Sequence, residues 1–135
     1  MNGPVALALL ALALATAASP VRAAERGMYT AGQAQAGRAV YASHCAQCHG
    51  TGMQGGTGPA LVGEPFERSL AHDHLSAPQL FDFITSHMPA GEPGLLADKQ
   101  YLQAFAHLLA RNGYAAGDTP LTKANLGRVK LLSRH

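Results

Sequence analysis

The chain has 135 residues and a formal net charge of +2 at neutral pH, so it suits a single domain and lacks the strongly basic balance of a nucleic-acid-binding protein. After residue 23, Val and Ile occur only at Val40, Val62, Ile84 and Val129. Because β-sheets draw on β-branched apolar residues, this composition excludes a substantial sheet and predicts an all-α domain.

The N-terminal segment is predicted to be a secretory signal peptide. Residues 5–18 form an almost unbroken run of Ala, Leu and Val, and Ser-Pro-Val-Arg-Ala follows at residues 19–23. The run is shorter than the roughly 20 residues of a transmembrane helix, and the small residues after it suit a cleavage site. We therefore expect residues 1–23 to be removed, leaving a periplasmic domain of residues 24–135 with no membrane span. A retained anchor is the alternative, because no Lys or Arg precedes the run.

The first predicted helix begins after Thr30, which forms a capping box with Gln33. It is expected to continue to His44. Residues at helical spacing mark the face that packs against the rest of the domain, namely Gly37, Val40, Tyr41 and His44.

Two further main helices are predicted. One begins after Ser76, which pairs with Gln79 as a second capping box, and stops at Pro89. The other runs from about residue 98 to residue 111 and ends at Asn112-Gly113. Their expected inward faces are Leu80, Phe83, Ile84 and His87 for the first, and Tyr101, Leu102, Phe105, Leu108 and Leu109 for the second.

The remaining segments are predicted to be less regular. Residues 50–63 are rich in glycine and form a loop, and His72 and His74 are expected to face solvent from a loop. Residues 115–135 form a C-terminal tail with one short helix that directs Leu126, Val129 and Leu132 inward. The tail carries exposed cations, interpreted as a solvated surface, with a docking patch for an acidic partner as the alternative; they are Lys123, Arg128, Lys130 and Arg134.

The segment Cys45-Ala46-Gln47-Cys48-His49 has the spacing of covalent haem attachment. Two cysteines three residues apart on a helical turn project to the same side. There they can form thioethers with the two vinyl groups of one haem edge, while the adjacent imidazole ligates the iron. The sequence therefore predicts one covalent haem c, which also supplies core to a small domain.

Other interpretations of the two cysteines are weaker. A structural zinc site needs four ligands, and the chain has no third cysteine. A thioredoxin-like pair needs a βαβ unit, which the shortage of β-branched residues argues against. A disulfide between residues three apart would close a loop too short to stabilise the fold much.

Together these segments resemble the monohaem class I cytochromes c. More narrowly, the chain is similar to the small periplasmic cytochromes associated with bacterial quinoprotein alcohol dehydrogenases. The resemblance spans about residues 30–132 and implies that fold, with three main helices and loops around a covalently bound haem. It also implies a one-electron carrier between a dehydrogenase and an oxidase or membrane cytochrome. It depends most on residues 36–49, 58–63, 88–94 and 108–113.

The resemblance also implies roles for single residues. Met88 would be the axial ligand opposite His49, and the backbone carbonyl of Pro59 would accept a hydrogen bond from the other ring N–H of His49. Methionine opposite histidine raises the reduction potential, which suits electron transfer. Gly37 and Tyr41 match the crossing of the first and last helices, where the partner position is His107.

Alternatives to these roles stay open. Met88 could fill core, as many methionines do, and a histidine such as His87 could ligate instead. Met53 lies too close to the cysteine motif to be favoured. The expected protein is not an enzyme, although it could be the cytochrome subunit of one dehydrogenase. A haem enzyme or gas-binding cytochrome with an open or displaceable sixth position is the second hypothesis.

Overall fold

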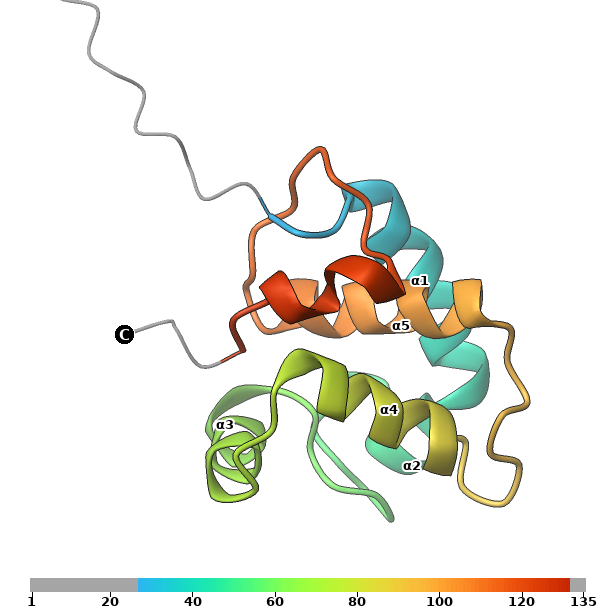
Figure 1. Cartoon of the computed structure of the whole chain (residues 1–135). Coiled ribbons are helices and arrows are strands. Elements are labelled where there is room, and N and C mark those ends of the chain that lie inside the picture. The colour runs from blue at the N-terminus through green and yellow to red at the C-terminus, as the bar shows by residue number, and fades with distance from the viewer. Residues whose placement is uncertain (1–26, 132–135) are drawn as a thin grey trace, which may run out of the picture.

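The computed structural model describes residues 27–131, in which helices are joined by loops (Figure 1). No strand occurs in this part of the chain, which confirms the all-α prediction. The predicted signal peptide, and Leu132 and Arg134 of the tail, lie outside the described residues. The elements are α1 (Ala31–His44), α2 (Ala46–His49), α3 (Gly63–His72), α4 (Ala77–His87), α5 (Asp98–Arg111) and the 3-10 helix η1 (Lys123–Arg128).

Both predicted capping boxes form. At the start of α1, the Thr30 hydroxyl accepts the Gln33 N–H at 3.1 Å, and the Gln33 side chain accepts the Thr30 N–H at 3.2 Å. Ser76 and Gln79 make the reciprocal bonds at the start of α4, at 3.5 and 3.0 Å. Each box gives partners to N–H groups that a helix start otherwise leaves unpaired, so local sequence sets where these helices begin.

Helices α1 and α5 cross and pack against each other (Figure 1). At the crossing, a Cβ added to Gly37 would lie 1.8 Å from the carbonyl oxygen of Gln103, so only glycine permits this approach. Next to it the rings of Tyr41 and His107 lie with centroids 5.8 Å apart. The predicted crossing of the first and last main helices is confirmed.

Helix α3 was not predicted from the sequence, and the prediction of a loop at His72 was wrong. Phe66 and Leu70 are buried on one face of α3, and the exposed side chains of Glu64 and Arg68 form an ion pair at 3.1 Å. Both pairs have the i, i+4 spacing of a helix, which is the signal that could have revealed it. His72 is the last residue of α3 and is exposed, as is His74.

The inward face of α4 also differs from the prediction. Phe83 is 47% exposed, and its ring stacks on that of His87, with centroids 4.5 Å apart. The buried residues of α4 are instead Ala77, Leu80 and Phe81, and the Phe81 ring meets Phe105 of α5 edge-on. The face of α4 that packs against the core therefore includes Leu80 and Phe81, and Phe83 lies outside it.

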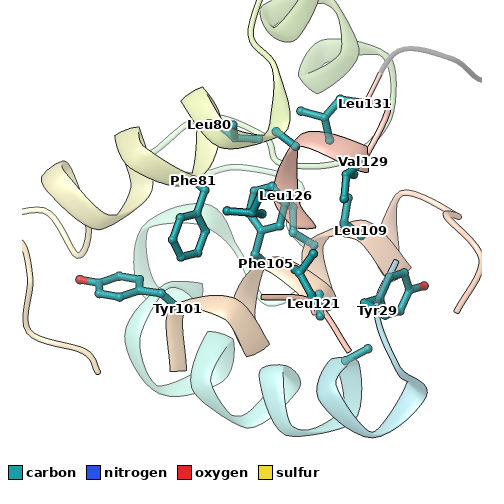
Figure 2. Close-up of a cluster of buried hydrophobic side chains, with 14 of the residues drawn as sticks. Tyr29, Leu80, Phe81, Tyr101, Phe105, Leu109, Leu121, Leu126, Val129 and Leu131 are labelled. Atoms are coloured by element: carbon teal, nitrogen blue, oxygen red, sulfur yellow. The ribbon is translucent and has the colours of Figure 1, made fainter. Parts of the chain in front are cut away.

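The segment after α5 packs against the helices. The Gln33 side chain donates to the Leu121 carbonyl at 2.9 Å and accepts the Leu121 N–H at 2.7 Å. Figure 2 shows the apolar residues of this segment, Leu121, Leu126, Val129 and Leu131, in one cluster with Leu109 and Phe105. The predicted short helix is η1, and Lys123 at its start pairs with Asp98 at 2.6 Å. Within residues 27–131, no helix is both long and apolar enough to cross a membrane.

Candidate haem-binding site

The cysteine motif forms a single helical turn directly after α1. Cys45 caps α1 through its N–H, which donates to the Tyr41 carbonyl at 2.9 Å. The N–H groups of Cys48 and His49 then both donate to the Cys45 carbonyl, at 3.2 and 3.0 Å. This turn gives the two cysteines the i, i+3 relation that their spacing predicts. Neither forms a disulfide.

The two thiols differ in environment. Cys45 is half-buried, whereas Cys48 is exposed. Burial raises the pKa of the Cys45 thiol, because a thiolate loses hydration in apolar surroundings. Cys45 is therefore a neutral thiol at neutral pH, and one of the two attachment points lies at the edge of the core while the other is open to solvent.

The glycine-rich loop folds back over this turn. Gly55 donates to the His49 carbonyl at 2.8 Å, and Gly58 donates to the Cys48 carbonyl at 2.9 Å. The Tyr41 hydroxyl donates to the Gly50 carbonyl at 2.6 Å. These bonds pair the carbonyl groups at the end of α2, which a four-residue helix cannot pair internally. The loop is thus a rigid support for the motif.

The orientation of the His49 ring in the candidate site is set by a hydrogen bond to the glycine-rich loop. It is buried, and its Nδ1 lies 2.8 Å from the carbonyl oxygen of Pro59. Since a carbonyl can only accept, Nδ1 carries the proton, and the lone pair is on Nε2. Nε2 has no hydrogen-bond partner among the described residues. The ring also lies against Gly58, where an added Cβ would come within 2.9 Å of it.

Met88 stands where α4 ends. Its N–H closes the helix on the Ile84 carbonyl at 2.9 Å, and its side chain is half-buried. Its carbonyl accepts a hydrogen bond of 2.6 Å from the hydroxyl of Tyr101 on α5. The sequence placed Tyr101 on the apolar face of its helix and contained no signal for this hydroxyl contact.

The competing candidates are placed differently. Met53 is 1% exposed, within the loop that follows the cysteine motif, and has a left-handed φ of 66°. His87 is exposed, with Nδ1 3.0 Å from the Phe83 carbonyl. Among residues 27–131, no group of three or more His, Cys, Asp or Glu side chains could hold a metal ion. The described part of the chain therefore offers no ligand set for the zinc alternative.

The donor set fits a c-type haem. Two free thiols share one helical turn, and the imidazole beside them presents an unprotonated Nε2 with its lone pair unpaired. A thioether is available on a separate, half-buried segment. These are the ligand types of a covalently attached haem with a histidine and a methionine as axial ligands.

Comparison with known proteins agrees with this chemistry. The model of a family described as cytochrome c oxidase, cbb3-type, subunit III matches residues 32–108. A cytochrome c-553-like protein of Synechocystis sp. is 34% identical over 93 residues, which cover 69% of this chain and 86% of that protein.

A solved structure shares the fold. The crystal structure of the sulfane dehydrogenase SoxCD from Paracoccus pantotrophus includes a chain that matches with a TM-score of 0.53 and 23% identity. The match covers 76% of this chain and 59% of that one, so this chain spans about three-fifths of its length. At this identity the likeness shows the shared fold alone.

Proposed function

Since this chain belongs to the cytochrome c family, as a monohaem class I cytochrome c with one covalent haem c, we propose that it is a periplasmic one-electron carrier. In this proposal Cys45 and Cys48 hold the haem as thioethers, and His49 and Met88 are the axial ligands. The electron donor is a periplasmic dehydrogenase, of the quinoprotein type in the subgroup that the sequence resembles. The acceptor is an oxidase or a membrane cytochrome.

The observation that carries the proposal is the hydrogen bond from His49 to Pro59. The Pro59 carbonyl oxygen lies 2.8 Å from Nδ1 and accepts its proton in a hydrogen bond, so it fixes both the tautomer and the orientation of the ring. Such a partner also raises the basicity of a ligand histidine toward iron. A rigid ligand lowers the reorganisation that each electron transfer requires, which suits a carrier.

Met88 supports the choice of an electron carrier over a haem enzyme. When bound, the haem supplies the ferrous–ferric couple, and methionine opposite histidine raises its potential. A thioether on the sixth position leaves no place for a substrate or a gas. The role needs no catalytic acid, base or nucleophile, and we therefore propose that the protein is not an enzyme by itself.

The proposal is tested by replacing Met88 and, as a control, the buried Met53 in parallel. Met88→Leu keeps the volume but removes the sulfur, so the potential is expected to fall and carbon monoxide to bind the ferrous protein. Each fall of about 59 mV changes the one-electron equilibrium about tenfold. Haem attachment should survive, because Cys45 and Cys48 are unchanged. The matched control, Met53→Leu, should leave the potential and the carbon monoxide behaviour as they are. Potentiometric titration with optical spectra measures both.

Two results would overturn the ligand assignment. If Met88→Leu kept the potential and excluded carbon monoxide, Met88 would not be the sixth ligand. If the unmodified ferrous protein bound carbon monoxide, the sixth position would be open, and the gas-binding cytochrome would be the better hypothesis.

The location and the partner need separate experiments. Mass spectrometry of the protein from a periplasmic extract should find a chain that begins near residue 24. Purification at moderate salt distinguishes a free carrier, which elutes alone, from a cytochrome subunit, which stays with its dehydrogenase.

A further inference from the structure

Residues 88–95, the part of the connection that follows α4 directly, are hydrogen-bonded to α5 through one hydroxyl group, that of Tyr101. The Tyr101 O–H donates to the Met88 carbonyl at 2.6 Å, and its oxygen accepts the Gly94 N–H at 3.1 Å. The other hydrogen bonds of this segment are local turns, from Glu92 to Pro89 at 2.9 Å and from Leu95 to Glu92 at 3.2 Å. Within residues 27–131, both hydrogen bonds from residues 88–95 to α5 therefore end on the same oxygen.

Tyr101 is suited to this task by its burial. The side chain is 3% exposed, and Figure 2 shows its hydroxyl directed away from the core cluster, toward the side where the connection between the helices runs. Its two partners are more accessible, since Met88 is half-buried and Gly94 is exposed. Loss of the hydroxyl would leave the partly buried Met88 carbonyl without its protein partner and would release the Gly94 N–H to solvent, so the two residues would no longer be held to α5.

The two bonds constrain the backbone on which the Met88 side chain stands. The helix holds the Met88 N–H through Ile84, at 2.9 Å, and Tyr101 holds the Met88 carbonyl on the other side. Because both of its backbone polar groups are paired, the point from which its side chain extends is fixed relative to α4 and α5. The bond to Gly94 ties the far end of the segment to α5 as well.

We propose that Tyr101 is a positioning residue that holds Met88 on the haem iron. This inference depends on the proposed function, in which Met88 is the sixth ligand. Without the Tyr101 hydroxyl, the segment opens more often, Met88 leaves the iron in a larger share of molecules, and the sixth position becomes available to other ligands.

The test uses imidazole as a probe that competes with Met88 on the ferric protein. Imidazole binds only when the methionine is off, so its apparent dissociation constant falls as the open share rises. Two partly buried hydrogen bonds are lost in Tyr101→Phe, and we expect imidazole to bind about tenfold more tightly. Optical titration measures the constant, and the Gly94 amide should exchange its hydrogen faster in the same variant.

A matched control separates positioning from general destabilisation. Tyr29 is also 3% exposed, and its hydroxyl likewise donates to a backbone carbonyl, that of Tyr114. Tyr29→Phe should lower the denaturation midpoint to a similar degree but leave imidazole affinity unchanged. If both variants changed the affinity equally, or if Tyr101→Phe did not change it, Tyr101 would have no positioning role.

A third variant distinguishes this inference from the ligand assignment. Met88→Leu should bind imidazole more tightly than Tyr101→Phe does, since it has no methionine to displace. If Met88→Leu did not change imidazole affinity, the ligand assignment would be wrong. If Met88→Leu tightened binding but Tyr101→Phe did not, the ligand assignment would stand and the role of Tyr101 would be rejected.

Discussion

At the scale of single residues, His107 has an environment unlike that of the other histidines. It is half-buried on α5 with its ring beside Tyr41 of α1. Burial lowers its pKa, and the positive charges of Arg111 on α5 and Arg38 on α1 lower it further. No acidic group contributes to this shift. His107 is therefore neutral in the folded protein at neutral pH.

This environment predicts a pH dependence of stability. The pKa of His107 lies near 6.5 in the unfolded chain and lower in the folded one, so the unfolded state binds more protons below that pH. Stability should thus be complete above pH of about 6.5 and decline as the pH falls through the folded-state pKa. His107→Gln should remove this part of the slope in urea denaturation curves recorded from neutral to mildly acidic pH.

The companion variant for that prediction changes Arg38, which is exposed on α1 and whose charge lowers the pKa of His107. Arg38→Gln should reduce this part of the slope without removing it. An unchanged slope in the His107 variant would show that other groups cause the acid sensitivity.

At the scale of elements, the crossing of α1 and α5 depends on Gly37. A methyl group there would lie 1.8 Å from the Gln103 carbonyl oxygen, and this atom belongs to the backbone of α5 and cannot move aside alone. Gly37→Ala should therefore push the helices apart. Overpacking of this kind costs about 1–3 kcal/mol, occasionally more. The denaturant midpoint is expected to fall accordingly.

Gly32 provides the matched control on the same helix. An added Cβ there meets only the Thr30 hydroxyl oxygen, at 3.9 Å. Because alanine is a better helix former than glycine, Gly32→Ala should stabilise the protein by about 0.5–1 kcal/mol. If both alanine variants changed stability in the same direction, close packing at the crossing would not be the cause.

At the scale of the whole molecule, the apolar side chains are buried to different degrees. One cluster, with members from α1, α3, α4, α5 and the C-terminal segment, is buried. Other apolar residues are only half-buried, among them Leu61, Val62, Ile84 and Met88. A domain this small needs an additional source of stability, and a covalent haem beside the half-buried residues would supply it.

This difference in burial predicts that the protein depends on its haem for folding. The double variant Cys45→Ser, Cys48→Ser should not accumulate as a protease-resistant periplasmic protein. The control is Met88→Leu, which alters the sixth ligand but keeps both attachment points and should accumulate normally. Recovery of a compact, protease-resistant double variant without haem would contradict the prediction. Limited proteolysis of periplasmic extracts measures the outcome.

Local features of this chain could be predicted from its sequence. The scarcity of Val and Ile excluded a sheet, and the capping pairs at Thr30 and Ser76 placed the starts of α1 and α4. The cysteine spacing predicted one covalent haem, and the resemblance pointed to the family. The capping pairs and the cysteine spacing lie within a few residues of the feature that they specify, because caps and motif spacing are local interactions.

Other features were decided only by tertiary packing. Phe83 carries an apolar side chain at helical spacing that the fold leaves exposed. The bond from Tyr101 to Met88 joins residues 13 positions apart, and Gln33 reaches Leu121 across 88 positions. No pattern along the chain encodes such contacts, because they exist only after α5 and the C-terminal segment have packed against their neighbours.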